Sequence, residues 1–543
     1  MTDHTATGGG EVIPKAETGP TPASPAAPKA EPEPTPASLA APKAAPATAP
    51  FPTPAIPMAR PDALAGTAEG QILSTTESLC PICLKVLPAE IVKSGDEASL
   101  CRICPEHGPF REAVWRGAPS FESWRRPKKP AVGLNVHREA NRGCPFDCGL
   151  CPEHGQYPCT VLLEITQSCD LGCPVCFASS GGKPEAKEDI GRFIDRLAFV
   201  KAQAGSVVLQ ISGGEPTVHP GLLDLVSAAT KLFPAVQLNT NGLNLAKDPE
   251  LAKELRRRGL TWVFLQFDSL NDQTLTTIRG RPILKEKLQA VDNLERAGLP
   301  TVLVPTVVKG LNDKELGELV SYAVSKPLVR GLHFQPMTTS GRNPFSGAEN
   351  RLTLPELLQE LGRQTKGGID VGLAFPPGCE HERCSFHLRF RRLPDGTLVP
   401  RPGQNDSSCC SKPPKTTDRP SDPSETAASR ERAVDIILRS WSPGGTQTID
   451  GSPADGGAGA RAPALAIPMA KRPPDAFDEF IAQAARESFS LTAMAFQDVW
   501  TVDLARLRGC CVHVFNPPDR FVPFCAMNLT SADGRALYRS PKP

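Results

Sequence analysis

The spacing Cys-x3-Cys-x2-Cys occurs twice in this chain of 543 residues, which contains 18 cysteines. The two copies are Cys144, Cys148 and Cys151, and then Cys169, Cys173 and Cys176. Thiols grouped at such short spacings are typical of metal or iron–sulfur ligands in a reducing compartment. Three thiolates hold three corners of a [4Fe–4S] cube and leave the fourth iron open. The second copy directly follows a predicted strand, so we assign it to a reactive cluster that binds a further ligand.

A fourth cysteine follows the first copy and indicates a closed cluster there. A closed [4Fe–4S] cluster carries electrons or stabilises the fold, because no iron is left open to a substrate. The ligands that we assign to it are Cys144, Cys148, Cys151 and Cys159.

Two further pairs of cysteines have the spacing of a knuckle site. These pairs are Cys80 with Cys83 and Cys101 with Cys104. Four thiolates suit either zinc or a single rubredoxin-like iron, and the spacing alone favours structural zinc. We expect the nearby His107 to cap a turn rather than to bind the metal.

Seven more thiols lie after the predicted barrel, and four of them suffice for another closed cluster. Vicinal cysteines cannot easily serve the same cube, so we expect some of the seven to be inert. For His381 and His387 we favour structural roles over metal binding. The preferred ligands are Cys379, Cys384, one of Cys409 and Cys410, and Cys525.

Short β-rich apolar runs alternate with helical patterns through the middle of the chain, which is typical of βα units around a parallel sheet. The predicted strands are 161–166, 206–212, 235–239, 262–267, 301–308 and 331–336. The predicted helices are 186–203, 220–232, 249–258, 272–297, 312–324 and 353–365. Six such units predict an α/β fold with a partial (β/α)6 barrel, because a closed barrel of eight units needs about 250 residues. Active sites on such folds lie at the C-terminal ends of the strands.

Polar residues follow several of these strands. Gly213, Gly214 and Glu215 end the second strand, where paired glycines allow close backbone approach to a ligand and a carboxylate accepts hydrogen bonds from an ammonium group. Asn239 and Asp268, at the ends of the next two strands, are further candidates for cofactor binding. Other candidates at this edge, including arginines for a phosphate, are Asn241, Arg279, Arg281 and Arg342.

The rest of the chain divides by composition. Residues 1–70 are rich in proline and alanine, and we expect a disordered tail because they bury too little apolar surface. The segments after it are a four-cysteine rubredoxin-like or zinc-ribbon module at 71–130, an auxiliary iron–sulfur segment at 131–160, the barrel at 161–366, an auxiliary cluster region at 367–410, a Pro/Gly-rich linker at 411–475 and a C-terminal cluster-completing segment at 476–543.

The charge balance excludes some classes of function. There are 60 Lys and Arg against 59 Asp and Glu, and no basic cluster, which argues against sequence-independent binding of nucleic acid. No run approaches the roughly 18 apolar residues of a membrane-spanning helix. The N-terminus has no basic region followed by an apolar stretch. We therefore expect a cytoplasmic protein.

The motif of Cys169, Cys173 and Cys176, followed one strand later by SGGEP, resembles the radical S-adenosylmethionine (radical SAM) superfamily. The resemblance implies that these cysteines are catalytic and that SAM chelates the open iron. It also implies a 5′-deoxyadenosyl radical, formed by reductive cleavage of SAM, that takes hydrogen from an unactivated C–H bond. The cofactors carry this chemistry, while the protein binds, orients and excludes water.

The same resemblance implies roles for neighbouring residues. Gly213, Gly214 and Glu215 would surround the methionyl amine of SAM. The residue before the third cysteine is commonly aromatic in the superfamily, but here it is Val175. Phe177 is an alternative residue for stacking on adenine.

The cysteine blocks as a whole, from about residue 75 to the C-terminus apart from the linker, resemble the tetraether lipid synthase-like radical SAM proteins. The blocks include CPFDCGLCPEHG, ITQSCDLGCPVCFASSGG, SGGEPTVHP, PPGCEHERCSFH and CCVHVFNPPDRFVPFCAMNLTSADGRALYR. The resemblance implies C–C coupling or modification of lipid alkyl chains, auxiliary [4Fe–4S] clusters and a rubredoxin-like iron, which moves the preference at the Cys80 site from zinc to iron. The implied partners are SAM, a lipid or other hydrocarbon-containing substrate, and a reductant such as ferredoxin or flavodoxin, with peripheral contact to a membrane.

Two other hypotheses remain open at this point. One is a radical SAM enzyme that modifies a peptide or another small molecule, which requires an open groove rather than a deep apolar tunnel. The other is an iron–sulfur electron carrier without catalytic activity.

Overall fold

The computed structural model describes residues 70–126, 139–181, 189–345, 350–401, 438, 441 and 487–539. All of these belong to one compact unit, Met58–Pro543. Most of the predicted tail, most of the predicted linker, Cys409 and Cys410 lie outside the described residues. Within the described residues, no helix is long and apolar enough to cross a membrane.

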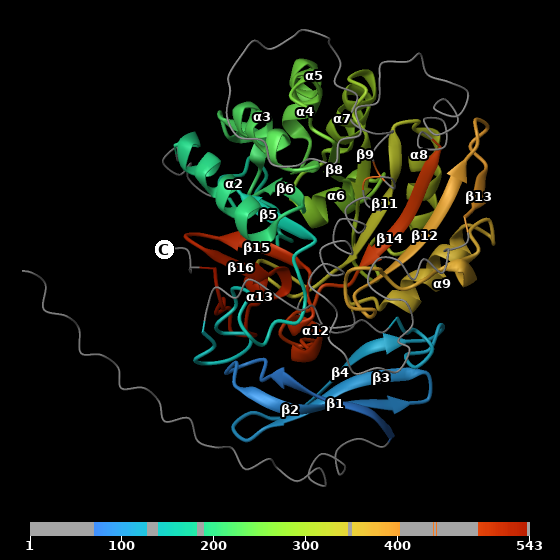
Figure 1. Cartoon of the computed structure of the whole chain (residues 1–543). Helices are drawn as coiled ribbons and strands as arrows, with labels where there is room; N and C mark the ends of the chain where they lie inside the picture. Colours follow the sequence, from blue (N-terminus) through green and yellow to red (C-terminus); the bar gives the residue numbers. More distant parts are fainter. Residues whose placement is uncertain are drawn as a thin grey trace, which may run out of the picture. The chain divides into compact units, whose positions relative to one another are not determined.

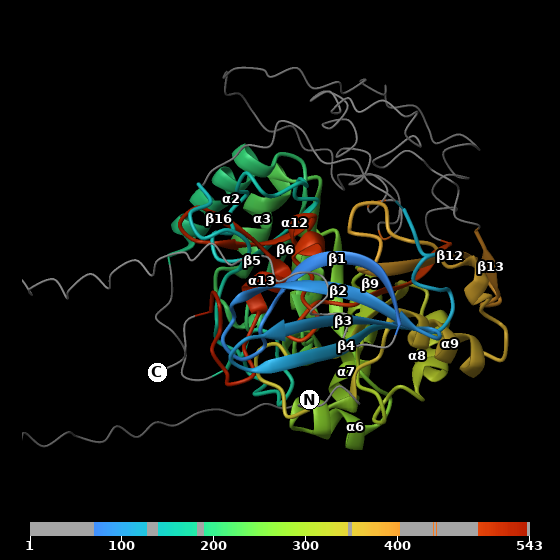
Figure 2. The ribbon, with the colours of Figure 1, turned by 90° about the horizontal axis from the view of Figure 1, so that it is seen from below.

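The N-terminal module is an antiparallel sheet of four strands in chain order (Figures 1 and 2). Its strands are β1 (Gln71–Leu79), β2 (Val86–Ser94), β3 (Glu97–Cys104) and β4 (Gly108–Arg116). Apolar residues that alternate along the strands, among them Ile91, Leu100 and Trp115, bury one face of the sheet in the main core.

The six predicted barrel strands are all present, and neighbouring strands pair in parallel. They are β5 (Thr160–Glu164), β6 (Val208–Ser212), β7 (Ala235–Thr240), β8 (Trp262–Gln266), β9 (Thr301–Val304) with the short β10 (Thr306–Val307), and β11 (Val329–Pro336). Their outward-facing residues are almost entirely Val, Leu, Ile and Phe and pack against helices. This pattern is typical of parallel strands that are covered on one face by helices.

Both edges of this sheet are extended by strands from later in the chain. The sheet order is β13-β12-β14-β11-β9-β8-β7-β6-β5-β15-β16. The added strands are β12 (Ser385–Arg392), β13 (Leu398–Pro400), β14 (Ser488–Met494), β15 (Val512–Asn516) and β16 (Arg520–Pro523). The C-terminal segment, drawn in red in Figure 1, therefore adds strands to both edges of the partial barrel.

The predicted helices lie close to their expected bounds. The helices are α2 (Ile190–Ala204), α3 (Leu222–Leu232), α4 (Leu243–Lys247), α5 (Pro249–Arg257), α6 (Asp272–Arg279), α7 (Leu284–Arg296), α8 (Leu316–Ser325), α9 (Leu354–Gln364), α12 (Leu504–Arg508) and α13 (Phe524–Asn528), with single 3₁₀ turns at Pro216–Val218 and Val371–Leu373. The helix predicted at 272–297 is two helices, because Gly280 ends α6 in the left-handed conformation (φ 83°). A capping box of Thr353 and Glu356 begins α9.

A buried charge network joins the N-terminal sheet, the segment before α9 and the C-terminal segment. Arg351 forms ion pairs with Glu112 on β4 and with Asp498, whose Oδ2 lies 2.6 Å from Arg351 Nη2. Burial alone would raise the pKa of Asp498, but the charge of Arg351 and the backbone N–H of Thr339 lower it. The Asp498 side chain is 1% exposed, so Arg351 compensates a charge that water does not reach.

We expect Arg351→Met to lower the free energy of unfolding by about 3–5 kcal/mol, because it leaves Asp498 buried and unpaired. The lowered pKa of Asp498 means that this contribution is present at neutral pH and is lost as the pH falls through that pKa. Denaturant titration at pH 7 measures the effect. Arg363→Met is the control, since Arg363 pairs with Glu360 at an exposed site (side chain 60% exposed) and should cost no more than about 1 kcal/mol. Equal losses in the two variants would contradict the prediction.

Candidate active site

The loop between β5 and α2 carries the second cysteine motif to a cavity of about 350 Å³ that extends into the barrel lumen. The cysteines that line this cavity include Cys169, Cys173 and Cys176. The loop is held by neighbouring backbone, since Val175 N donates to Ile278 O over 3.3 Å and Cys176 N donates to Arg342 O over 2.8 Å. Burial raises the pKa of Cys169 to about 12, so its free thiol is neutral at pH 7, and a bound metal would displace that proton.

The predicted glycine turn lies directly against this loop. Gly214 N donates to Thr166 O over 2.7 Å and Glu215 N donates to Ser168 O over 2.9 Å, which continues the pairing of β5 and β6 beyond the strands. A Cβ atom would lie 2.3 Å from Thr166 O if placed on Gly213, and 2.3 Å from Ser168 O if placed on Gly214. The close approach of these two backbones therefore requires glycine at both positions.

The carboxylate of Glu215 joins the ends of β6 and β7. It is 1% exposed, and Oε1 accepts hydrogen bonds from the hydroxyls of Thr217 and Thr240 over 2.6 and 2.7 Å. Its Oε2 accepts from Asn241 N over 2.7 Å, and the Asn241 side chain donates to Asp170 in the cysteine loop. Burial raises the pKa of Glu215 even though these bonds favour the charged form. Glu215 thus links two strand ends to the cysteine loop.

The structure places Asp268 in a different role from the predicted one. Its side chain is fully buried and is not among the described residues that line the cavity. Arg279 Nε and Nη2 donate to its two oxygens over 2.7 and 2.6 Å, and Thr306 N donates to Oδ1 over 2.9 Å. Burial alone would raise the pKa of Asp268, but Arg279 lowers it. Because Arg279 Nη1 also donates to Val175 O over 3.0 Å, this ion pair fixes the cysteine loop just before Cys176.

The other two candidate arginines also bind carbonyl groups of the loop. Arg342 Nε donates to Cys173 O over 2.6 Å, and its Nη2 donates to Ser180 O over 2.9 Å. Arg281 Nη2 donates to Asp170 O over 3.2 Å. The arginines that the sequence offered for a phosphate therefore hold the backbone around the cysteines.

Amide side chains line the lumen next to this loop. Asn239 Nδ2 donates to Gln210 Oε1 over 3.1 Å, and Asn239 Oδ1 accepts from Gln237 Nε2 over 2.5 Å. Gln237 Oε1 in turn accepts from the indole N–H of Trp262 over 2.8 Å. Other polar residues on the cavity wall are Gln266, His333, Gln335, His387, Arg389 and Thr492. Asn239 is thus part of a chain of amides that faces the cavity.

Aromatic side chains from the C-terminal segment line the same cavity. The ring of Phe177 packs edge-on against Phe496 and Phe524, with centroids 5.6 and 5.8 Å away. Val175 also lines the cavity and is 8% exposed. Phe496 and Phe524 were not predicted, because no sequence pattern links them to Phe177, which lies more than 300 residues earlier.

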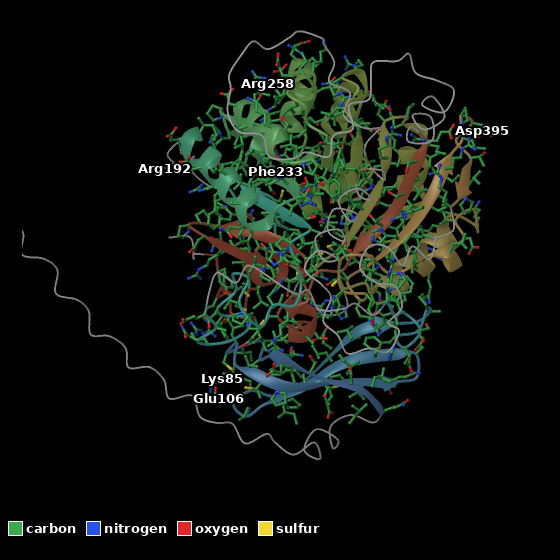
Figure 3. The ribbon with its side chains drawn as sticks, in the orientation of Figure 1. Lys85, Glu106, Arg192, Phe233, Arg258 and Asp395 are labelled. Carbon is green, nitrogen blue, oxygen red and sulfur yellow. The ribbon has the colours of Figure 1, made fainter. Side chains whose placement is uncertain are left out.

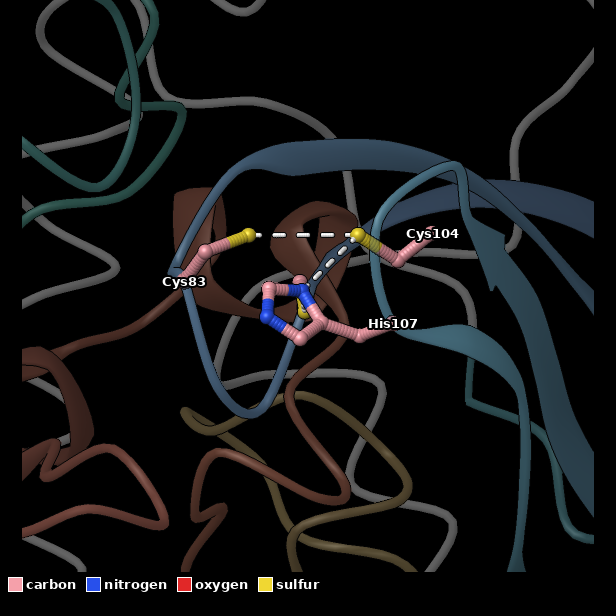
Figure 4. Close-up of side chains that lie close together, drawn as sticks. Cys83, Cys104 and His107 are labelled. Carbon is pink, nitrogen blue, oxygen red and sulfur yellow. Dashed lines mark hydrogen bonds between the residues drawn. The ribbon is translucent and has the colours of Figure 1, made fainter.

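The N-terminal sheet brings together a four-ligand group at its tip, shown in Figure 4. Cys80, Cys83, Cys104 and His107 each place one ligand atom within 4.8 Å of the others. His107 Nδ1 lies 3.6 Å from Cys80 Sγ and 3.4 Å from Cys104 Sγ. The turn between β1 and β2 and the turn between β3 and β4 are also joined by the ion pair of Lys85 and Glu106, labelled in Figure 3. Three thiolates and one imidazole form a donor set of structural zinc sites.

The prediction that Cys101 completes this group is wrong, and so is the expectation that His107 only caps a turn. Cys101 and Cys104 both lie within the extended strand β3, which separates them by about 10 Å. Cys101 sits in register with Glu90 on β2 and Arg111 on β4, inside the sheet. A histidine after the following turn therefore supplies the fourth ligand atom.

Comparison with known proteins identifies two family matches and several relatives. Residues 163–323 match the family described as the radical SAM superfamily, and residues 72–116 match the HMPTM N-terminal zinc ribbon domain. The 7,8-dihydro-6-hydroxymethylpterin dimethyltransferase of Methanocaldococcus jannaschii is 29% identical over 496 residues, which cover 83% of this chain and 93% of that protein. The GTP 3′,8-cyclase of Peptoclostridium acidaminophilum is 30% identical over 260 residues, which cover 44% of this chain and 78% of that protein.

The chain belongs to the radical SAM superfamily. It is a radical SAM enzyme, which sets aside the hypothesis of an electron carrier without catalytic activity. Among solved structures, SuiB of Streptococcus suis with bound S-adenosylmethionine superposes with a TM-score of 0.31 at 16% identity, over 39% of this chain and 47% of that chain.

The radical SAM enzyme groups its remaining described cysteines differently from the prediction. Apart from Cys101, electrostatic interactions relate them as three sets of three, which are Cys144, Cys148 and Cys151; Cys159, Cys379 and Cys511; and Cys384, Cys510 and Cys525, with a further interaction between Cys510 and Cys511. The first set shares a small cavity with His154. In the second, Cys159 Sγ lies 3.0 Å from Cys511 Sγ, and Cys379 interacts with both. In the third, the thiols interact electrostatically.

These sets differ from two of the predicted clusters. Cys159 faces Cys511 because both immediately precede paired parallel strands, with Thr160 on β5 opposite Val512 on β15. Cys379 and Cys384 fall into different sets, and Cys510 joins the one that contains Cys384 and Cys525. Of the two neighbouring histidines, His387 stacks on Phe375 and His381 Nδ1 accepts a hydrogen bond from Arg383 N.

We expect Gly213→Ala to lower the free energy of unfolding by about 1–3 kcal/mol and to abolish SAM cleavage, because its Cβ would collide with the backbone of the cysteine loop. Anaerobic denaturant titration and the yield of 5′-deoxyadenosine measure the two effects. Gly172→Ala is the matched control within that loop, since nothing lies within 4 Å of its Cβ position. A fully stable Gly213→Ala variant would show that the two backbones can separate.

We expect the four-ligand group to bind a metal ion that His107→Ala loses and Cys101→Ser keeps, because His107, unlike Cys101, places a ligand atom in that group. Quantitation of zinc and iron per chain by mass spectrometry measures the difference. The outcome that contradicts the geometry is the reverse one, in which Cys101→Ser loses one metal ion and His107→Ala retains it.

Proposed function

We propose that Cys169, Cys173 and Cys176 bind a [4Fe–4S] cluster whose fourth iron binds SAM. The observation that carries this proposal is that the three thiols and the turn at Gly213 and Gly214 line one cavity beside each other. The three side chains leave one corner of a cube without a protein ligand. When bound, the cluster and SAM supply a 5′-deoxyadenosyl radical that takes a hydrogen atom from a C–H bond.

The neighbouring cavity residues supply the SAM contacts in this proposal. Gly213 and Gly214 offer backbone next to the cysteine loop, and Glu215 Oε2 has one acceptor position left for the methionyl ammonium. Asn239 presents its amide to the polar part of the cofactor. Phe177 offers the aromatic face for adenine, because Val175 has none.

The rest of the chain positions these groups and excludes water. Arg279, held by Asp268, and Arg342 bind the cysteine loop at three backbone carbonyl groups, those of Val175, Cys173 and Ser180. The aromatic cluster of Phe177 and Phe496 covers the cavity with apolar surface. A reactive radical needs both effects, because water and misplaced substrate divert it.

For the substrate, we propose a polar, planar heterocycle that becomes methylated at carbon, with a second SAM molecule as the source of each methyl group and S-adenosylhomocysteine as the leaving product. The other amides of this chain, Gln210 and Gln237, offer donors and acceptors in the lumen, which suit the edge of such a ring. The relative from Methanocaldococcus jannaschii, aligned over 83% of this chain, is named a dihydropterin dimethyltransferase. That name and the polar lumen support the same class of substrate.

A second candidate function is the coupling or modification of lipid alkyl chains. One observation, the apolar lining of part of the cavity, favours it. Two groups of apolar side chains line the cavity, one of Phe496 and Phe524 and the other of Val208, Phe264 and Trp441. Such walls accept a hydrocarbon chain, and this function would bring the protein to a membrane surface. Neither relative described above is named for a lipid, so this candidate ranks second.

We further propose auxiliary iron–sulfur clusters at the three sets of three cysteines and zinc at the tip of the N-terminal sheet. Buried thiols whose pKa is raised, such as Cys525 (to about 12 by burial), are stable as thiolates only when a cation binds them. The sulfur and nitrogen donors of the four-ligand group favour zinc over a rubredoxin-like iron, which takes four sulfurs. A low-potential reductant such as ferredoxin or flavodoxin would supply the electrons.

The test is anaerobic incubation with SAM and dithionite, together with either 6-hydroxymethyl-7,8-dihydropterin or a diether lipid. We expect 5′-deoxyadenosine and a pterin product heavier by methyl groups. Changing Cys169, Cys173 and Cys176 to Ala should lower the rate of 5′-deoxyadenosine formation by at least about 1000-fold. This corresponds to an increase of about 4 kcal/mol in the activation free energy. Cys101→Ser is the matched control, because Cys101 lies inside the sheet.

A lipid product that has lost hydrogen, with the pterin unchanged, would make the second candidate the function. SAM cleavage that persists after all three cysteines are changed would contradict the site itself.

A further inference from the structure

Helix α12 directs Arg506 at one of the three auxiliary sets of cysteines. Arg506 Nη2 donates to Cys384 Sγ over 3.2 Å and lies 3.5 Å from Ala495 O. Asp503 begins this helix as its N-cap and accepts hydrogen bonds from Ala505 N and Arg506 N, which fixes the start of the turn that carries the guanidinium. The side chain is therefore held against sulfur by the fold.

The guanidinium has donor capacity that the described residues do not use. Its Nε atom is inaccessible to solvent and has no hydrogen-bond partner among the described side chains and backbone. In the described part of the chain, no carboxylate forms an ion pair with Arg506, although Arg508, two residues on, pairs with Glu77. A buried, charged N–H group without a partner is costly unless an anion completes it.

The cysteines around Arg506 supply such an anion when they hold a cluster. Cys384, Cys510 and Cys525 interact with one another, and Cys525 Sγ also accepts a hydrogen bond from Gln497 N over 3.3 Å. Thiolate ligands give a [4Fe–4S] cluster net negative charge, and reduction adds one more electron to it. Hydrogen bonds and positive charge at the sulfurs favour the reduced form and raise the reduction potential.

We propose that Arg506 is a positioning residue that raises the reduction potential of an auxiliary cluster held by Cys384, Cys510 and Cys525. This inference rests on the proposed function, in which those cysteines bind iron. The step that Arg506 favours is a one-electron reduction, in which a low-potential donor of the ferredoxin class is oxidised by one electron and the cluster takes it up. Cys384 directly precedes Ser385, which lines the substrate cavity, so this cluster lies next to the place where a substrate radical would gain or lose an electron.

The experiment uses the full-length protein with Cys169, Cys173 and Cys176 changed to Ala, so that only auxiliary clusters contribute to the signal. Redox titration followed by electron paramagnetic resonance gives the midpoint potential of each cluster. We expect Arg506→Gln to lower the potential of one cluster, with at least a tenfold smaller equilibrium constant for reduction, or about 59 mV for one electron. Arg506→Lys keeps the positive charge but lacks the planar guanidinium group, so it should lower the potential less than Arg506→Gln does.

Arg258→Gln is the matched control, because this arginine, labelled in Figure 3, is the exposed C-cap of α5 and is far from these cysteines in the sequence. It should leave all potentials unchanged. A purely structural role would lower the stability of Arg506→Gln while the potentials stayed constant, and that result would overturn the inference. An equal shift of every cluster would overturn it as well. If the starting protein holds no iron, the auxiliary clusters of the proposed function fail, which is a different result from iron that is present at an unaltered potential.

Discussion

The active site depends on the contact between two backbones that continue past the ends of β5 and β6. Thr166 and Ser168 accept hydrogen bonds from Gly214 and Glu215, and the approach is so close that no Cβ fits at Gly213 or Gly214. One of these backbones leads directly into the cysteine motif. The glycines therefore place the cysteines and the cofactor-facing turn together, and either strand alone could not do so.

Two arginines, Arg279 and Arg342, also hold the backbone of the cysteine loop in place. Arg279, held by Asp268 at the end of β8, binds the carbonyl of Val175, and Arg342 binds the carbonyl of Cys173. Such charges are expensive to bury unless every donor and acceptor is used, and here the carboxylate of Asp268 is fully bonded. The consequence is a cysteine loop whose backbone is held by protein groups, which reduces the ordering cost of metal binding.

Sequence patterns predicted the parts of the fold that repeat and the parts of the site that follow a strand. All six barrel strands and the positions of Cys169, Cys173, Cys176 and the glycine turn came from local periodicity and spacing, since a parallel sheet puts the ends of its strands at one edge. The role of Asp268 was not visible in the same way. Its position at a strand end was correct, but whether a carboxylate meets a ligand or a buried arginine depends on a residue eleven positions later, on another element.

The three sets of cysteines show where spacing in the sequence no longer predicts which cysteines lie together. Spacing predicts ligands only when they share a turn, as Cys80 and Cys83 do, and it failed for Cys101 because an extended strand separates residues three apart. It failed for Cys159 for a topological reason, because β15 pairs with β5 and brings Cys511 beside it from more than 350 residues away.

The pairing of β15 and β14 with opposite edges of the partial barrel explains why the C-terminal segment touches so many of the cysteines. Between these strands the chain must cross from one edge to the other, and this crossing carries Asp498, Arg506, Cys510 and Cys511. Each edge strand is fixed by its register, so the residues of the crossing have little freedom to move. A segment held at both ends in this way can position a charge such as Arg506 against a thiol over 3.2 Å, which a free C-terminal tail could not maintain.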